Sequence, residues 1–335
     1  MEKMYEGPIT FISPNCKFIK ILNRTSSLTK PEFTISSTHR LANPNFFYNH
    51  AEFLRWQPTG KILRFSMNDD SGPLVWIHFT IVDGEAVSLS KAPFGSFEWR
   101  SHLDRELTQD LIKQIIEHCE SMGIKRILIK HFARSYHPDH YDLICNELLK
   151  EKFDISRNCR NFHIDLQHDY FKSVHPSELR RLKKAKKWQL KFEEVPGLDK
   201  SWLYDTISAW WRSRNYQVSV DKKPFLGMTT TLPDRYKIFA VFLETRIIAL
   251  AVTVVVSADI LYLFYPATDP GHYHLSPMVF MTFSLCNYAQ KHGFKMLDLG
   301  IANSGNQELP GLIRFKKNLG ALESEKTEFE RILTK

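Results

Sequence analysis

Apolar residues along this chain alternate or recur in an order that appears twice. In residues 61–95, three apolar runs rich in β-branched and aromatic residues predict three strands, with Asp83-Gly84 typical of a hairpin turn. Residues 104–122 then place leucine and isoleucine at helical spacing, Gly123 ends that helix, and KRILIK follows as a strand. The first pattern is therefore three strands, a helix, a glycine and a strand.

The second half of the chain repeats this order. Residues 236–268 predict three strands, and Pro277 suits the first turn of a helix that Gly293 ends before the strand MLDLG. Ser276, like Asp104 in the first copy, stands where a helix N-cap is expected. We interpret the chain as a tandem duplication of one α/β unit; the alternative is chance, since helix–glycine–strand is common in α/β proteins.

The two copies meet near residue 160. NFHIDL predicts a strand that leads into the second copy, and SELRRLKKAKKW predicts a helix with Ser177 as its N-cap. We predict an α+β (mixed α/β) fold of two tandem domains, each with a mixed, largely antiparallel sheet flanked by helices. The predicted boundaries are 1–160 for a degenerate first domain and 161–335 for a second domain that carries the active site.

Composition adds constraints on size, compartment and partners. The 335 residues exceed what one core usually fills, and the net charge of +8 favours a polyanionic partner: nucleic acid, a nucleotide-bearing substrate or an anionic membrane face. No apolar stretch reaches the length of a membrane span. Five scattered cysteines without CxxC spacing predict free thiols, and MEKMYEGPITF lacks a secretory apolar segment, so we expect a cytoplasmic protein.

Several motifs between about residues 125 and 321 carry a family resemblance. NFHIDL precedes the basic segment LRRLKKAKKWQL, and YAQKHGFKMLDLG precedes LPGLIRFKKNLGA, in which Gly311 to Gly320 has the form G-L-x-x-F-K-x-x-x-G. In these segments the chain resembles the Fem family of aminoacyl transferases and the related tandem-GNAT acetyltransferases of bacteria. The resemblance implies the GNAT acyltransferase fold and direct attack of an amine on an activated acyl carbon.

The loop before the second predicted helix is the candidate donor site. A helix N-terminus that follows antiparallel strands can hold a phosphate, and acetyl-CoA-using GNAT domains carry Q/R-x-x-G-x-G/A there. This chain instead has DPGHYHLSPM, with one glycine. Our candidate residues for acyl-CoA (acetyl-CoA) are Gly271, His274, Leu275 and Ser276.

The run 180–191 is the candidate acceptor site. It holds seven basic residues out of twelve and no acid, and Arg180, Arg181, Lys184 and Lys187 share a helical face. The resemblance to Fem-type enzymes implies that this face binds the phosphates of a nucleotide-linked acceptor. The alternative is a solvated helix face without a ligand.

Three residues of the second copy are candidates for the chemistry. Asp298, at the end of a predicted central strand, can accept the proton of the amine directly or through water. The resemblance implies that Lys316, or Lys317 in another register, stabilises an oxyanion or holds the carrier's phosphate. Tyr265, with Tyr262 as the alternative, can protonate a leaving thiolate. Structural roles for the aspartate, lysine and tyrosines remain the alternatives.

We therefore expect an N-acyltransferase, acetyltransferase-like, that moves an acyl group from acyl-CoA to an amine of a small, nucleotide-linked or polysaccharide-linked acceptor. One alternative is a Fem-type transferase that uses aminoacyl-tRNA. The other is a non-catalytic GNAT-fold protein that binds phosphate or RNA. We expect no metal, because His137 and His140 fall in a predicted turn without further ligands.

Overall fold

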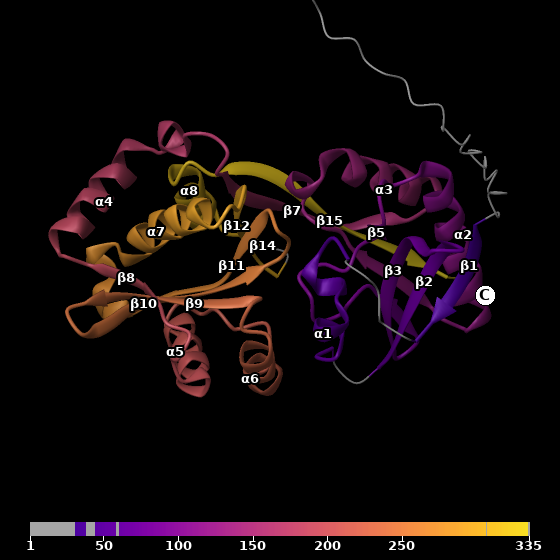
Figure 1. The fold of residues 1–335 in the computed structure, drawn as a ribbon, viewed down its shortest axis with the longest axis horizontal. Helices are drawn as coiled ribbons and strands as arrows, with labels where there is room; N and C mark the ends of the chain where they lie inside the picture. Colours follow the sequence, from indigo (N-terminus) through magenta and orange to yellow (C-terminus); the bar gives the residue numbers. More distant parts are fainter. Residues whose placement is uncertain (1–30, 38–43, 58–59, 306, 334–335) are drawn as a thin grey trace, which may run out of the picture. The chain divides into compact units, whose positions relative to one another are not determined.

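The structure is a computed structural model that describes residues 31–37, 44–57, 60–305 and 307–333. Cys16 and the first eleven residues, on which the thiol and signal-peptide expectations partly rest, lie outside these ranges. The main feature is one mixed sheet that contains strands of both sequence copies (Figure 1). Its order is β1-β2-β3-β4-β6-β15-β7-β12-β11-β10-β9-β8, with β5 paired to β3. The expected α+β class with mixed sheets and flanking helices is confirmed.

The first copy contains the predicted three strands, helix, glycine and strand, but the turn predicted at His137 and His140 is instead the start of a helix, Pro138–Lys150. The Asp104 carboxylate accepts a hydrogen bond from the Leu107 N–H at 2.9 Å and so caps its helix, and Gly123 ends that helix at φ +71°. The third strand is shorter than predicted, because the chain turns away after pairing with its neighbour. The elements are β1 (Glu32–Ser36), η1 (Phe47–Asn49), α1 (Ala51–Leu54), β2 (Lys61–Asp69), β3 (Gly72–Val82), β4 (Glu85–Val87), β5 (Glu98–Trp99), α2 (Arg105–Ser121), β6 (Arg126–Lys130), η2 (Arg134–Tyr136) and α3 (Pro138–Lys150).

The second copy repeats this order and adds helices before its first long strand. The predicted cap Ser177 lies inside a helix that His175 caps. Ser276 is the N-cap residue of its helix, as predicted, but its backbone is left-handed (φ 58°) and its side chain makes no capping hydrogen bond. After β7 (Asp154–Asp165), the last strand of the first copy, the elements are η3 (Tyr170–Ser173), α4 (Pro176–Lys187), β8 (Lys191–Glu194), α5 (Lys200–Arg212), α6 (Lys222–Thr231), β9 (Tyr236–Leu243), β10 (Arg246–Val255), β11 (Ile260–Thr268), η4 (Pro270–Leu275), α7 (Pro277–Lys291), β12 (Met296–Ile301), β13 (Asn303–Ser304), β14 (Gln307–Glu308), α8 (Pro310–Asn318) and β15 (Leu322–Ile332).

Each copy contributes its last strand to the sheet of the other copy. β15, which ends the second copy, pairs antiparallel with β6, and β7, which ends the first copy, pairs antiparallel with β12. β7 and β15 also pair with each other, with Cys159 opposite Lys326, and so join the two halves of the sheet (Figure 1). Residue 160 lies inside β7, and the division into domains 1–160 and 161–335 stays a prediction.

Two clusters of buried apolar side chains lie on opposite faces of the second copy's strands. One cluster joins the first copy to the face covered by α5 and α6, where the Phe47 N–H also donates to the Val256 carbonyl at 2.8 Å. The other contains residues of α4, α7 and α8, together with Leu297 and Leu299 of β12. Side chains alternate along a strand, so Asp298 faces the first copy. Among the described residues, no helix is long and apolar enough to cross a membrane.

Candidate active site between the two sequence copies

Asp298 lies where two neighbouring parallel strands stop pairing. β11 and β12 pair from Ile260 opposite Met296 to Tyr262 opposite Asp298, and in the described chain they do not pair beyond that point. β12 then has a bulge, and Gly300 adopts φ +72°. A Cβ on Gly300 would lie 3.1 Å from the Tyr262 ring, so both the backbone angle and the space favour glycine. The two strands therefore separate next to the Asp298 carboxylate.

The carboxylate of Asp298 is held by both copies. It is 2% exposed; Oδ2 accepts from the Tyr136 hydroxyl at 2.5 Å, and Oδ1 accepts from Asn161 Nδ2 at 2.9 Å and from the Gly300 N–H at 2.7 Å. Tyr136 belongs to η2 of the first copy. Burial, with the neighbouring charge of Asp298, raises the pKa of Tyr136, so the phenol stays protonated and remains a donor.

A cavity of about 460 Å³ opens beside this cluster. Phe46, Trp99 and Tyr136 of the first copy line one side, and His163 and Asp165 of β7 line part of the other. His163 lies directly opposite Asp298 in the β7–β12 ladder. Burial lowers the pKa of His163, against the opposing effect of the Asp298 charge, so the imidazole is neutral near pH 7.

Sequence reasoning missed Tyr136, Asn161 and His163. A signal for two of them was present in NFHIDL, where polar Asn161, His163 and Asp165 alternate with apolar residues, as on a strand with one polar face. Tyr136 had no such signal, because its contact with Asp298 spans 162 residues.

Lys316 lies close to this site, but its ammonium group is already bonded. Nζ donates to the carbonyl oxygens of Leu299, Gly300 and Ile301 at 2.7, 2.9 and 2.8 Å. Burial lowers the pKa of Lys316 to about 7. With three acceptors in place, the side chain ties α8 to the end of β12 and has no N–H left for an oxyanion. Lys317, the alternative, is half-exposed and pairs with Glu323 at 2.9 Å.

The two candidate tyrosines of β11 have different surroundings. The Tyr265 hydroxyl accepts from the N–H groups of Ser219 and Val220 at 3.1 and 2.9 Å, so it anchors the connection between α5 and α6. Tyr262 is the residue paired with Asp298, and burial with the Asp298 charge raises its pKa. The structure therefore brings Tyr262, rather than Tyr265, beside the carboxylate.

The candidate acyl-CoA loop is a turn closed around Asp269. Its Oδ1 accepts from the Gly271 N–H at 3.0 Å, and its Oδ2 contacts His272 Nδ1 and Arg246 at 3.0 Å each. Leu275 is 2% exposed in the core, whereas His274 is exposed. The Asp269 carboxylate is thus already bonded to the Gly271 N–H, which is a donor that a pyrophosphate would need. Its negative charge would also repel a pyrophosphate, so this form of the loop disfavours coenzyme A.

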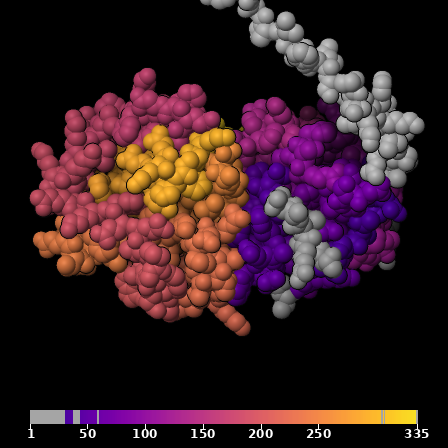
Figure 2. Space-filling model, in the orientation of Figure 1, coloured from indigo at the N-terminus to yellow at the C-terminus, as the bar shows by residue number. Residues whose placement is uncertain are grey.

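The basic helix α4 lies at the surface of the second copy (Figure 2), and the burial of its residues places the cations on its exposed side. Arg180, Lys184 and Lys187 are exposed, and within the described ranges no carboxylate lies within 4.0 Å of their charged groups. Arg181 pairs at 2.8 Å with Glu178, a buried acid just before the run. α4 packs against α7 and against η4, the turn that forms part of the candidate donor loop.

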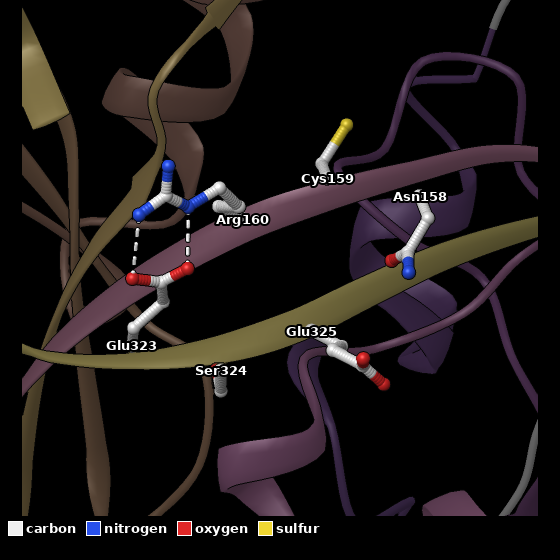
Figure 3. Close-up of a pocket in the computed structure, with 6 residues that line it drawn as sticks. All are labelled: Asn158, Cys159, Arg160, Glu323, Ser324 and Glu325. Atoms are coloured by element: carbon white, nitrogen blue, oxygen red, sulfur yellow. Dashed lines mark hydrogen bonds and ion pairs between the residues drawn. The ribbon is translucent and has the colours of Figure 1, made fainter. Parts of the chain in front are cut away.

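Two other features do not add chemistry to this site. A cavity of about 370 Å³ lies where β7 and β15 pair, and Figure 3 shows Arg160 bonded to Glu323 through two hydrogen bonds across that junction. His137 and His140 stack at 3.7 Å between ring centres, and the described residues hold no group of three or more metal-ligating side chains. Cys119, Cys145, Cys159 and Cys286 are free thiols.

The order of elements and the separation of β11 from β12 are those of a GNAT-fold protein built from two copies. Residues 172–317 match the family model described as an acetyltransferase (GNAT) domain. The expected Fem-like, tandem GNAT architecture is confirmed at the level of the fold by three solved structures.

Of these structures, FemX has a TM-score of 0.64 at 14% identity and covers 89% of this chain and 94% of its own. L-PGS from Bacillus licheniformis has a TM-score of 0.57 at 11% identity, covering 82% of this chain and 84% of its own. A tandem GNAT protein from the clavulanic acid biosynthesis pathway has a TM-score of 0.51 at 9% identity, covering 84% and 86%. None of the curated proteins matches this sequence significantly.

Proposed function

We propose that this protein transfers an acyl or aminoacyl group to an amine of an acceptor bound in the cavity between the two copies. The observation that carries the proposal is the buried Asp298 cluster at the point where β11 and β12 separate inside a GNAT fold. β11 also has a bulge near Phe264, between the pairs Val252–Tyr265 and Thr253–Leu263. An irregular central strand can turn a backbone N–H toward the acyl carbonyl.

The geometry favours an aminoacyl-tRNA as the donor. Asp269 occupies the turn that a coenzyme A pyrophosphate would use, and α4, which packs against the same turn, carries exposed cations. Acyl-CoA is the second candidate, supported by the match of residues 172–317 to an acetyltransferase domain. We place the reaction in a reducing cytoplasm, because the four described cysteines are free.

A transfer assay tests this proposal. The protein would be incubated with radiolabelled acetyl-CoA, or with tRNA charged with labelled amino acids, and a panel of small and nucleotide-linked amines. We expect labelled amide from charged tRNA, and loss of that product in Asp298→Asn. Labelled product from acetyl-CoA would favour acyl-CoA as the donor. No transfer from either donor, together with RNA binding that Asp298→Asn leaves intact, would favour the non-catalytic alternative.

A further inference from the structure

His163 stands between the cavity and the Asp298 carboxylate. The two residues are direct partners on neighbouring antiparallel strands, so their side chains lie on one face of the sheet. Asp298 already accepts three hydrogen bonds and is 2% exposed, whereas His163 lines the cavity. An amine that enters the cavity therefore meets the imidazole before it meets the carboxylate.

The imidazole of His163 is available as a base. It is 8% exposed, and neither ring nitrogen has a hydrogen-bond partner among the described residues; Nδ1 is buried, which leaves Nε2 as the nitrogen that a ligand can reach. The other ionisable groups around it are engaged with one another. Asp165 pairs with His168 at 2.8 Å, Asp259 pairs with Lys295 at 3.1 Å, Tyr136 donates to Asp298, and His137 stacks on His140. A neutral imidazole with an unpaired nitrogen can take a proton from an attacking amine.

We infer that His163 accepts the proton of the acceptor amine, and that Asp298 is the positioning residue that stabilises the imidazolium. This inference rests on the proposed function. The amine nitrogen bonds to the acyl carbon and gives its proton to the imidazole. The bond from the acyl carbon to the leaving oxygen or sulfur then breaks, and the imidazolium returns the proton to that atom directly or through water. Atoms and charges balance without a further reactant.

A pH profile of transfer separates this role from a structural one. The variants are His163→Gln and His163→Ala, with His168→Gln as the matched control, because His168 lies nearby but is exposed. For wild type we expect kcat/KM to fall at acidic pH as the imidazole becomes protonated. In His163→Gln we expect kcat to fall about 100-fold or more, with KM little changed and the acidic fall absent. Added imidazole should restore part of the rate of His163→Ala.

The outcomes distinguish the two proposals. If wild type transfers an acyl group and His163→Gln keeps its rate, or keeps the acidic fall, the role of His163 is wrong and the proposed function stands. If wild type transfers nothing from charged tRNA or acetyl-CoA, the proposed function fails and this inference fails with it. Thermal unfolding of each variant, and rescue by imidazole, exclude loss of rate through misfolding.

Discussion

Tyr136 of the first copy donates its hydroxyl hydrogen to Asp298 of the second copy across 2.5 Å. Hydrogen bonds to a buried carboxylate are stronger than neutral ones, and their loss leaves a charge partly unsatisfied. The degenerate first copy thus has a specific part in the candidate site, because its Tyr136 hydroxyl donates a hydrogen bond to the carboxylate of the second copy.

Replacing Tyr136 by phenylalanine should weaken the site without unfolding the protein. We expect kcat to fall 10-fold to 100-fold, roughly the effect of losing about 1.5–3 kcal/mol from a hydrogen bond to a charged group. Tyr141→Phe is the control, because the Tyr141 hydroxyl is also buried and bonds Thr327 Oγ1 at 2.6 Å, away from Asp298. Transfer assays and thermal unfolding of both variants check this, and equal loss of kcat in the two would contradict it.

Lys316→Met should destabilise the protein, because the carbonyl oxygens of Leu299, Gly300 and Ile301 lose their shared donor. We expect the free energy of unfolding to fall by about 2–4 kcal/mol, measured by chemical denaturation. Lys317→Met, one residue along and half-exposed in an ion pair, should cost less than about 1 kcal/mol. A stable Lys316→Met protein that has lost only transfer would instead support the oxyanion role expected from the sequence.

The exchanged strand β15 should be essential to the first copy. Phe329 is 1% exposed and lies opposite Ile129 of β6, so Phe329→Ala should cost about 3–5 kcal/mol of unfolding free energy. Ile332→Ala lies on the same strand with the side chain 60% exposed and should change stability by less than about 0.5 kcal/mol. In Phe329→Ala, amide hydrogen exchange should show a larger loss of protection in β6 than in the strands of the second copy. Unchanged protection of β6 would argue against the pairing of β15 with the first copy as a source of stability.

Glu98 should make stability depend on pH. It is buried and accepts from the N–H groups of Asn45 and Phe46 and from Asn49 Nδ2, and burial raises its pKa to about 7 from 4.5. The folded protein then holds this proton more tightly than the unfolded chain. Its contribution is greatest below pH 4.5 and falls by about 3 kcal/mol as the pH rises to 7.

Denaturation of Glu98→Gln between pH 4.5 and 7.5 measures this contribution. The difference between wild type and variant should change with pH in that window, whereas the exposed control Glu117→Gln should follow wild type throughout. A parallel pH dependence of wild type and Glu98→Gln would show that the carboxyl group is already ionised in the folded protein over this range.

Removing exposed cations from α4 should weaken binding of tRNA. The variant Arg180→Gln/Lys184→Gln/Lys187→Gln should make the slope of log affinity against log salt shallower by about 2 to 3. The reason is that fewer counterions are released from the RNA on binding when phosphate contacts are lost. The control replaces three exposed lysines of the first copy, Lys61, Lys125 and Lys152, by glutamine and has the same net charge. Equal loss of affinity in both would mean that net charge, rather than α4, attracts the RNA.

Local sequence patterns were sufficient to predict the repeated order of three strands, a helix, a glycine and a strand, but not the helices α3 and α6. Strand alternation, helical spacing, the Asp104 cap and the stops at Gly123 and Gly293 depend on neighbours within a few residues, so they can be read without knowing the fold. The same holds for Asp298, which lies on the central strand where the pattern placed it.

Long-range pairing set the rest. The exchange of β7 and β15 and the bond from Tyr136 to Asp298 join residues more than a hundred positions apart, and no local pattern encodes such partners. The register of β11 and β12 places Tyr262, not Tyr265, beside the carboxylate. The position of α8 next to β12 lets Lys316 donate its hydrogen bonds to three backbone carbonyls. A side chain's chemistry follows from its type, but its availability depends on the buried groups that tertiary contacts bring to it.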